Sequence, residues 1–403
     1  MKRNVLQLID SFHQGGTERQ MVQLTRLLHE SGEYRVHVAC LSPEGPLRRE
    51  VEDLHLGDIR AFPLKSFYDR NFLVQLGRFA RLLRERSIDV VHTHGFYTNI
   101  FGMAGARLAG VPARIASRRE TGGMRTGSQQ RVERSAYRLA HAIIANAEAV
   151  REQLINEGVR AEKIDVVYNG LDLERLTPRR NVGRDETLAA LNLPRAGARR
   201  IVTIVANLRH AVKDHPTFLR AARRVREAVP EAAFVIAGEG ELMESLQALA
   251  AELNLTNDLF FIGRCERVPE LLAVSEVCVL SSVAEGFSNS ILEYMAAGRA
   301  VVATDVGGAR EAISEGVTGY LVAAGDDRQM ATRLITLLRD EQARRRMGER
   351  GRARVEEKFS CAAQLERTEK LYARRLLVSR TRRRAAPAHS VESLERERLK
   401  QNL

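Results

Sequence analysis

The chain has 403 residues, of which 44% are hydrophobic, and a formal net charge of +12 at pH 7. The hydrophobic content excludes a disordered chain, and the length predicts two domains rather than one. The positive charge favours acidic partners such as phosphates, anionic lipid or nucleic acid, although an arginine-rich surface without such a partner would have the same composition.

The N-terminus, MKRNVLQLID, carries basic residues and an apolar run that is too short for a signal peptide, so it predicts a first buried strand. No apolar stretch approaches the roughly 20 residues that a membrane-spanning helix needs. The four cysteines lie far apart, in no spacing typical of a zinc site or a disulfide framework. We therefore expect a cytoplasmic protein, either free or peripheral on the inner face of the cytoplasmic membrane.

Short runs that are apolar throughout alternate with longer helical patterns along both halves of the chain. The first half contains predicted helices at 17–31, 72–86 and 146–157, and predicted strands at 4–9, 35–41, 89–94, 113–117, 141–147 and 164–170. The second half contains predicted strands at 200–208, 232–238, 259–263, 277–282, 300–306 and 319–324. Such runs are typical of parallel strands covered by helices on both faces, so each half is predicted to be a doubly wound α/β sheet.

The two halves are separated by residues 172–198, which combine proline, glycine and charge in the manner of a linker with little to bury. We therefore predict an N-terminal domain at 1–175 and a C-terminal domain at 176–356. The carboxyl ends of their strands would lie on either side of one cleft. Residues 378–403 lose the apolar pattern and are expected to form a disordered basic tail, either solvated or in contact with a membrane.

The stretch AEGFSNSILEYMAAG, residues 284–298, predicts an anion-binding helix start directly after a strand. Ser288 or Asn289 can cap the helix. The free amides of the first turn and the helix dipole favour an anion such as a diphosphate, and Gly286 would let that anion approach the backbone closely.

Two glutamates of this stretch extend the same interpretation. Glu293, inside the helix, can accept two hydrogen bonds from a vicinal diol. Glu285, before the turn, can reach the group that lies beyond the phosphates. A sugar nucleotide has this layout, because its diphosphate lies between a ribose diol and a sugar.

The spacing of these two glutamates resembles the E-x7-E motif of the retaining GT-B glycosyltransferases of family 4. Similar stretches extend over nearly the whole chain: GGTE, VVHTHG, AIIANAEAVREQL, VVYNGLDLERL, VANLRHAVKDHPTFLRAA, FVIAGEGELMESL and GRAVVATDVGGAREAISEGVTGYLV. The resemblance implies a GT-B fold, in which two Rossmann-like domains face a cleft. It also implies that a helix at about 357–377 crosses back to pack on the first domain.

The resemblance further implies roles for individual residues. Lys213 and Arg209 would neutralise the leaving diphosphate, while Glu285 and His94 would contact the donor sugar. The donor nucleotide and diphosphate would be bound by Gly15, Gly16, Glu293, Phe287, Ser288 and Asn289. The acceptor side would include the basic loop 117–131, with the candidates Arg118, Arg119 and Glu120. The pattern departs at Asn207, where many relatives have arginine.

These roles imply transfer of a sugar from a nucleotide-diphosphate sugar to a glycan or lipid-linked acceptor in bacterial-type polysaccharide biosynthesis. UDP is the expected nucleotide, and GDP is the alternative. The acceptor hydroxyl would attack on the face that the phosphate leaves, so the anomeric configuration would be retained. The sequence has neither a D-x-D motif nor a P-loop motif, and we expect no metal and no cofactor.

Other interpretations stay open. His92 and His94 lie two apart on a strand and share a face, but no neighbouring residues complete a metal-ligand set. The paired glutamates could belong to a glycosidase, and a sugar-nucleotide epimerase would use a similar cleft. The glycine pair could merely form a turn. A nucleic-acid binder would explain the charge, but only 5% of residues are aromatic and tryptophan is absent, so we expect no nucleic-acid partner.

The helix predicted at 72–86 has an apolar face surrounded by arginines, which are Arg78, Arg81, Arg84 and Arg86. This composition suits a helix that lies on anionic lipid. It also suits a helix that packs on the sheet, which is the interpretation we favour.

Overall fold

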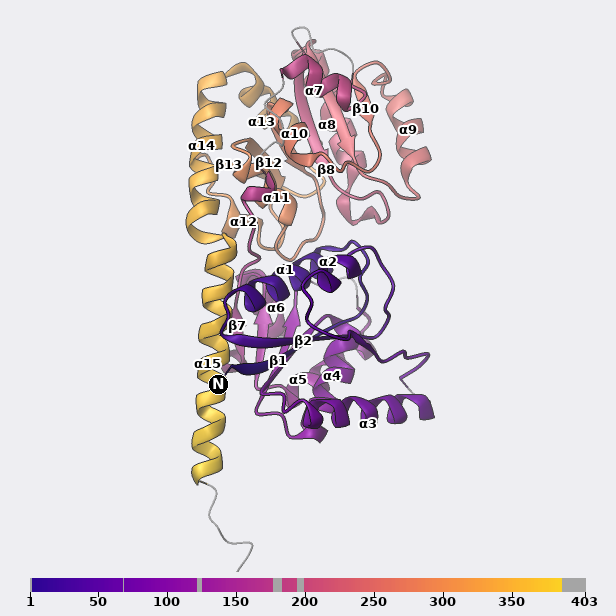
Figure 1. Cartoon of the computed structure of the whole chain (residues 1–403). Coiled ribbons are helices and arrows are strands. Elements are labelled where there is room, and N and C mark those ends of the chain that lie inside the picture. Colours follow the sequence, from indigo (N-terminus) through magenta and orange to yellow (C-terminus); the bar gives the residue numbers. More distant parts are fainter. Residues whose placement is uncertain (1, 68, 122–124, 177–182, 194–198, 386–403) are drawn as a thin grey trace, which may run out of the picture.

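The computed structural model describes residues 2–67, 69–121, 125–176, 183–193 and 199–385, which form two α/β domains placed end to end (Figure 1). In the first domain, the described strands form one parallel sheet of seven, in the order β3-β2-β1-β4-β5-β6-β7. Their bounds are Arg3–Ile9 (β1), Tyr34–Cys40 (β2), Arg60–Ala61 (β3), Val90–His94 (β4), Ala113–Arg118 (β5), Ala142–Ala145 (β6) and Ile164–Val166 (β7). The strands predicted in this half are confirmed. The sequence did not predict β3, because two exposed residues carry no apolar pattern.

Helices cover both faces of the first sheet. Their bounds are Gly16–Glu30 (α1), Arg48–Glu52 (α2), Arg70–Glu85 (α3), Phe96–Ala109 (α4), Gly127–Leu139 (α5) and Glu148–Asn156 (α6). Along β1, Leu6 and Leu8 pack in the core under α3 and α4, whereas Val5 packs in a separate core with α1. This alternation follows from the two-residue period of a strand, and it leaves the central strands buried on both faces.

The second domain contains a parallel sheet of six described strands, in the order β10-β9-β8-β11-β12-β13. Their bounds are Arg200–Val205 (β8), Ala232–Ala237 (β9), Leu259–Phe261 (β10), Val277–Leu280 (β11), Ala300–Thr304 (β12) and Gly319–Val322 (β13). The helices of this half are Arg184–Ala190 (α7), His215–Ala228 (α8), Met243–Glu252 (α9), Val268–Val274 (α10), Asn289–Ala296 (α11), Ala309–Ala312 (α12), Asp327–Arg339 (α13) and Glu341–Lys358 (α14). The strands predicted in the second half are confirmed.

The strand order predicts where each sheet would bind a ligand. In the first sheet β1 lies between β2 and β4, and in the second β8 lies between β9 and β11. Ligands of doubly wound sheets bind outside the carboxyl ends of the strands at such a reversal of strand order. His94 is the last residue of β4, and the segments that follow β1, β8 and β11 carry Gly15, Lys213 and Glu285. The prediction of two doubly wound parallel sheets is confirmed, and the strand order places these residues at the carboxyl ends of the strands.

The chain crosses back to the first domain between α14 and the last described helix, α15 (Cys361–Ala385). α14 runs along the second domain and α15 along the first (Figure 1). At the crossing, the Leu171 amide donates to the Phe359 carbonyl at 2.8 Å, and the Cys361 amide donates to the Leu171 carbonyl at 3.2 Å. Tyr372 of α15 is fully buried against the first sheet.

Two sequence expectations about connecting segments are corrected. The segment 172–198 was expected to bury little, but it contains α7, whose Leu188 is fully buried in a core of the second domain. Its residues 177–182 and 194–198 lie outside the described residues. The tail was expected from residue 378, but α15 continues to Ala385. The rest of that expectation concerns residues 386–403, which also lie outside the described part.

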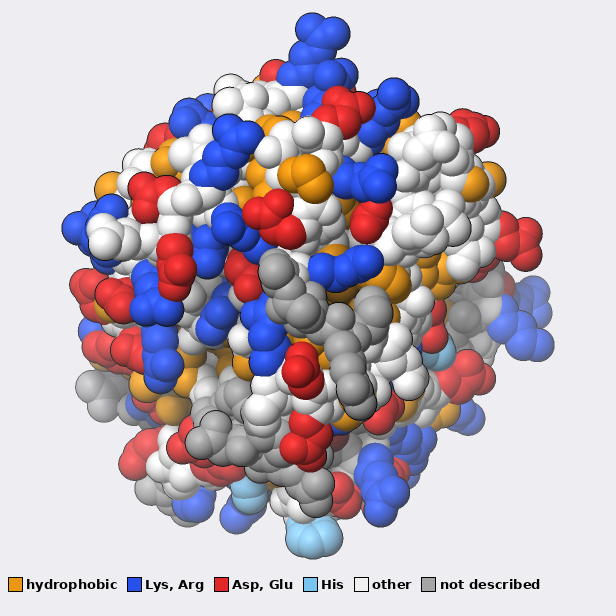
Figure 2. All heavy atoms as spheres, turned by 90° about the horizontal axis from the view of Figure 1, so that it is seen from above, with side chains coloured by type: hydrophobic (Ala, Val, Ile, Leu, Met, Phe, Trp, Pro, Cys, Tyr) orange, Lys and Arg blue, Asp and Glu red, His pale blue; other side chains and the backbone are white. Residues whose placement is uncertain are grey.

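Surface charge at the free end of the second domain is mixed. Figure 2 views this end, and it shows Lys and Arg side chains interspersed with Asp and Glu rather than forming one continuous basic face. Exposed ion pairs contribute to this pattern, such as Arg224 with Asp327 at 2.6 Å and Arg345 with Glu341 at 2.6 Å. The described residues at this end of the molecule therefore offer no extended basic face of the kind that binds nucleic acid.

Candidate active site

The start of α11 is built as the sequence predicts. Ser288 is the N-cap residue, and its hydroxyl accepts a hydrogen bond from the Ile291 amide at 3.4 Å. α11 begins at Asn289, and the left-handed Gly298 (φ 68°) follows its end. The remaining first-turn amides have no partner within the helix, so this end can receive an anion.

Gly286 has a different role from the one expected. A Cβ atom at this position would lie 2.0 Å from the carbonyl oxygen of Arg119 in the first domain. Glycine is therefore needed for the close approach of the two domains, and the expected approach of a phosphate to this Cα is not supported. The Thr121 hydroxyl adds an interdomain contact, donating to the carbonyl of Glu285 at 2.6 Å.

Lys213 and Glu285 form an ion pair beyond the carboxyl ends of β8 and β11 in the second sheet. The Lys213 Nζ atom lies 2.6 Å from Glu285 Oε1, and the Ser282 hydroxyl donates to the same oxygen at 2.7 Å. Both side chains are largely buried, at 20% and 13% exposure. The next residue, Asp214, adopts a left-handed backbone (φ 42°) and caps α8, and the Ser281 hydroxyl donates to the Lys213 carbonyl at 2.7 Å. The pair fixes the position of the Lys213 ammonium, whose charge Glu285 balances.

Arg209 lies apart from this pair. Its side chain is 56% exposed, and its nearest carboxylate is Glu239, at 3.7 Å. An exposed guanidinium with a long ion pair is poorly fixed for electrostatic catalysis. In this state of the protein, Lys213 is therefore the cation that the structure positions.

Glu293 is a half-buried carboxylate in the second turn of α11. Among the described residues, no hydrogen bond or ion pair satisfies it. Burial raises its pKa to about 7, an effect that the positive charge of Arg19 partly opposes. Burying a carboxylate without a partner costs free energy, which a ligand that donates hydrogen bonds would recover. Two vicinal hydroxyls fit this requirement.

We predict that Glu293→Gln stabilises the unliganded protein above pH 7. The carboxyl has a pKa of about 7 in the folded protein and 4.5 as its ordinary value. The folded state thus holds a proton that the unfolded state has released between these values, so stability falls as pH rises through that window. The gain for the amide should be on the order of 1–3 kcal/mol near pH 8 and small near pH 4.5. Urea unfolding at pH 8 and at pH 4.5 measures this difference in the free energy of unfolding, and the exposed Glu244→Gln is the control. An equal gain at the two pH values would contradict a raised pKa at Glu293.

His94 lies at the carboxyl end of β4, where it is buried in a polar network. Its Nε2 lies 2.6 Å from Gln7 Oε1, an acceptor, so Nε2 carries the proton. Its Nδ1 is buried and has no partner among the described residues, which leaves a free acceptor. Burial holds the pKa of His94 well below its ordinary value, so the ring is neutral.

The network continues to the C-terminal helix. The Gln7 side-chain amide donates to the Tyr372 hydroxyl at 3.2 Å, and that hydroxyl lies 2.8 Å from His92 Nδ1. His92 Nε2 lies 2.6 Å from the Ser117 hydroxyl. The rings of His92 and His94 share a face, with centroids 4.1 Å apart, as the strand spacing predicts. Both nitrogens of His92 have protein partners, which argues against the metal alternative for this pair.

The glycine pair faces α11 across the domain interface. Gly15 is the N-cap residue of α1, and a Cβ there would lie 2.1 Å from Glu18 Oε2. A Cβ at Gly16 would lie 3.6 Å from Asn289 Nδ2. The pair therefore forms the turn between β1 and α1 and also brings the first domain against the start of α11.

Asn169 connects the two domains at this site and was missed as a functional candidate. Its amide nitrogen donates to the Phe287 carbonyl at 3.0 Å and to Asn289 Oδ1 at 2.8 Å. Its oxygen accepts from Arg119 at 2.7 Å. The only signal in the sequence is an Asn-Gly pair after a strand, in VVYNGL, which also fits an ordinary turn. The side chain of Asn289 is thereby fixed, and that of Phe287 is buried.

The acceptor-side candidates fall into different environments. Arg118 is 1% exposed and binds both carboxylate oxygens of Glu157, at 2.6 and 2.9 Å, so its expected acceptor contact is corrected to a structural role. Glu120 pairs with Arg125 at 2.5 Å and is 39% exposed. Arg119 faces the interface, where burial lowers its pKa to about 10. Its Nε atom has no partner among the described residues, so it is the candidate best placed for an anionic group.

Comparison with known proteins agrees with this geometry. Residues 14–175 match Glycosyltransferase Family 4, and residues 192–354 match Glycosyl transferases group 1. The chain is 27% identical over 373 residues to the Escherichia coli UDP-Gal:α-D-GlcNAc-diphosphoundecaprenol α-1,3-galactosyltransferase, covering 89% of this chain and 93% of that protein.

A second relative and a solved structure extend the comparison. The chain is 30% identical over 223 residues to the Campylobacter jejuni N-acetylgalactosamine-N,N'-diacetylbacillosaminyl-diphospho-undecaprenol 4-α-N-acetylgalactosaminyltransferase, covering 54% of this chain and 56% of that protein. The crystal structure of Anabaena HepE in complex with UDP is similar in fold, with a TM-score of 0.82 at 21% identity, covering 93% and 100% of the two chains. These matches favour a glycosyltransferase over the glycosidase, epimerase and nucleic-acid-binding alternatives. The chain belongs to the family 4 glycosyltransferases and is a glycosyltransferase of the GT-B fold.

Proposed function

We propose that this glycosyltransferase transfers a hexosyl group from a UDP-sugar to a lipid-linked or glycan acceptor, with retention at the anomeric carbon. One observation carries the proposal: the Lys213–Glu285 ion pair, 2.6 Å long, adjoins the capped start of α11, whose second turn holds the unpartnered Glu293. The Lys213 ammonium and the free amides of α11 suit a diphosphate, and the Glu293 carboxylate suits the ribose that is attached to it. The E. coli relative is named for a UDP-sugar, and the HepE structure contains UDP, which supports the choice of nucleotide.

In this proposal the leaving diphosphate is stabilised by groups that are already in place. Lys213 supplies a fixed charge, and the first-turn amides of α11 supply oriented donors. Such preorganised donors lower the barrier most when they point to where negative charge develops. The imidazole of His94, neutral and with a free Nδ1, would accept a hydrogen bond from a hydroxyl of the sugar.

The environment of Glu285 bears on how retention would be achieved. Its carboxylate is neutralised by Lys213 and accepts a hydrogen bond from Ser282, so it is a poor nucleophile for a covalent sugar intermediate. The acceptor hydroxyl would attack on the face that the diphosphate leaves, and a phosphate oxygen would take its proton. The bond from the anomeric carbon to the phosphate oxygen breaks as the bond to the acceptor oxygen forms.

The acceptor would enter from the first domain. Arg119 lies at the interface, and among the described residues its Nε has no hydrogen-bond partner, so its guanidinium suits the phosphate of a lipid-linked glycan. Both relatives described above are named for undecaprenol-diphosphate glycans, which supports such an acceptor.

Thermal-shift titration with UDP, GDP and ADP tests the donor, and we expect UDP to give the largest shift. Incubation with UDP-sugars and a diphospho-polyprenol glycan should then yield a product whose anomeric proton, by NMR, has the donor's configuration. No shift with any nucleoside diphosphate, or an inverted product, would overturn the proposal.

We further infer that the transfer needs no divalent metal. The charge that a metal would supply to the diphosphate is provided by Lys213 and the helix start. Activity should therefore stay within about twofold after dialysis against EDTA. A loss that Mg²⁺ or Mn²⁺ restores would contradict this inference.

No helix among the described residues is both long and apolar enough to span a bilayer. We propose that the enzyme nevertheless works at the membrane surface through α3. This helix packs Phe79 and Leu83 into the core, as the interpretation we favoured requires, yet it exposes Leu73 (67%) and Val74 (52%). The arginines of α3 lie along the same helix. Leu73 and Val74 could therefore insert into the lipid while the arginines bind anionic headgroups.

The α3 surface should bind vesicles that contain phosphatidylglycerol. Leu73→Ser combined with Val74→Ser should weaken co-sedimentation roughly tenfold, because two exposed apolar side chains lose their burial in lipid. Val317→Ser, at a 41% exposed position of the second domain, is the control. Equal binding by the double variant and the control would reject membrane contact through α3.

A further inference from the structure

The second domain contains a cavity of about 750 Å³ on the side away from the proposed donor site. It lies at the amino ends of β8, β11 and β12, whereas the donor site lies at the carboxyl ends of these strands. Its walls also include the start of α7 and the turn between α13 and α14. Cavities of 300–1,000 Å³ are typical of small-molecule sites.

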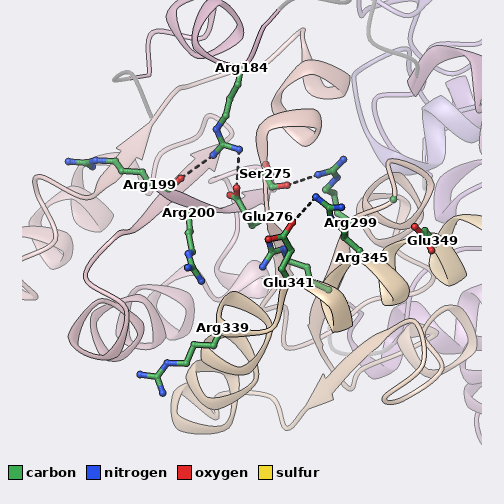
Figure 3. A pocket seen from close by; sticks show the side chains of 12 residues that line it. Arg184, Arg199, Arg200, Ser275, Glu276, Arg299, Arg339, Glu341, Arg345 and Glu349 are labelled. Atoms are coloured by element: carbon green, nitrogen blue, oxygen red, sulfur yellow. Dashed lines mark hydrogen bonds and ion pairs between the residues drawn. The ribbon is translucent and has the colours of Figure 1, made fainter. Parts of the chain in front are cut away.

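The lining of this cavity is positive. Among the described residues, seven arginines and three glutamates line it. Arg199 and Arg200 also pair with Asp258 and Glu231 outside the lining, at 3.6 and 3.3 Å, which leaves a surplus of two positive charges. Figure 3 shows that Arg184 points to Glu276, Arg345 points to Glu341, and Arg299 points to Ser275. Two of these arginines are neutralised there: Arg184 lies 2.9 Å from Glu276, and Arg345 lies 2.6 Å from Glu341.

Two other arginines are held by carbonyl groups instead. Arg299 donates to the carbonyls of Ser275 at 2.9 Å and Ala297 at 3.0 Å, and Arg344 donates to the carbonyl of Leu337 at 3.0 Å. Within the described part of the chain, neither forms an ion pair. A carbonyl oxygen orients a guanidinium but does not neutralise it, so both keep their charge and free N–H groups.

The electrostatic environment of Arg344 agrees with this assignment. Burial lowers its pKa, and the neighbouring charges of Arg200 and Arg345 lower it further, although Glu276 and Glu341 oppose the change. A half-buried guanidinium in such surroundings is stabilised by an added anion. Arginine clusters bind phosphate groups well, because each guanidinium can donate two parallel hydrogen bonds.

We propose that this cavity is a second ligand site, separate from the donor site, that binds an anion carrying two or more phosphate groups. The phosphates contact Arg299 and Arg344, and they compete with Glu341 for Arg345, whose ion pair is exposed and therefore weak. They belong either to a soluble polyphosphate compound or to the headgroup of an anionic lipid. Binding at this site is independent of glycosyl transfer and of the identity of the donor nucleotide.

The proposal is tested by isothermal titration of sodium tripolyphosphate into the full chain at about 0.1 M salt. Arg344→Gln combined with Arg345→Gln should weaken binding at least tenfold. The matched control is Arg346→Gln with Arg352→Gln, exposed positions on the same helix whose partners are Gln342 and Glu356. It removes the same net charge and should change binding less than twofold. Lys213→Ala, measured in parallel, identifies any component that comes from the donor site.

Further variants keep the test valid if the double variant is unstable. Arg345→Gln alone alters an exposed residue and should weaken binding about threefold, whereas Glu349→Gln removes a negative charge from the wall and should tighten it about twofold. Vesicles that contain cardiolipin, whose headgroup carries two phosphates, distinguish the two sources of phosphate. A lipid headgroup is indicated if vesicle binding is lost with the pocket variant, and a soluble ligand if only tripolyphosphate binding is lost. If neither probe distinguishes the pocket variant from its control, the site does not exist.

Discussion

Replacing Lys213 with alanine should lower kcat by about 10²–10³-fold, the usual loss when one preorganised group for a developing oxyanion is removed. The reason is its position, with Nζ fixed 2.6 Å from Glu285 beside the start of α11. The change also leaves Glu285 without its cation, which adds repulsion against the diphosphate. Steady-state kinetics with a UDP-sugar at saturating acceptor measures the effect.

Arg209→Ala is the comparison for this variant. The Arg209 side chain is 56% exposed and lies 3.7 Å from its nearest carboxylate, so its loss should cost less than tenfold in kcat. Lys213→Arg should recover only part of the activity, because a planar guanidinium does not fit the place of an ammonium. If Arg209→Ala loses more activity than Lys213→Ala, the principal cation has been misassigned.

Replacing Glu293 with alanine should raise the donor KM by roughly 30-fold or more, with a smaller change in kcat. The carboxylate would accept two hydrogen bonds from the ribose, and each hydrogen bond to a charged group contributes about 1.5–3 kcal/mol. It has no partner among the described residues, and its pKa of about 7 reflects this isolation. Donor affinity in the parent should therefore also strengthen as pH rises through 7, because the ionised form is the better acceptor.

The control is Glu244→Ala, which alters an exposed glutamate on α9 and should leave the donor KM unchanged. Calorimetry with UDP alone separates binding from turnover, since the ribose contact is made by the nucleotide. An unchanged UDP affinity in Glu293→Ala would show that another residue holds the ribose. Glu293→Gln, which should be more stable than the parent above pH 7, should also lose UDP affinity, so the lost binding could not be ascribed to unfolding.

The sequence was sufficient for the parts of this protein that depend on local pattern. Parallel strands buried on both faces are apolar throughout, so the strands could be predicted from continuous apolar runs. The cap at Ser288 could be predicted from its residue type and its position before the helix. The resemblance to the family 4 glycosyltransferases, and not a local pattern, assigned Lys213 and Glu285 to one site, although 72 positions separate them in the chain.

Other features could not be read because they depend on contacts between distant segments. Arg118 looks like a ligand-binding arginine in a basic loop, but the fold places Glu157 against it. Gly286 fits a phosphate loop, but the Arg119 carbonyl occupies the space beside it. Asn169 has no distinguishing pattern, and its role appears only when both domains are in place.

The central claim is that the start of α11, Lys213 and Glu293 together bind a uridine diphosphate. A crystal structure of the full chain with UDP tests this most directly. We expect the diphosphate on the first-turn amides of α11 and within hydrogen-bonding distance of Lys213, with both ribose hydroxyls on the Glu293 carboxylate. UDP bound elsewhere, or a ribose that leaves Glu293 unpartnered, would contradict it.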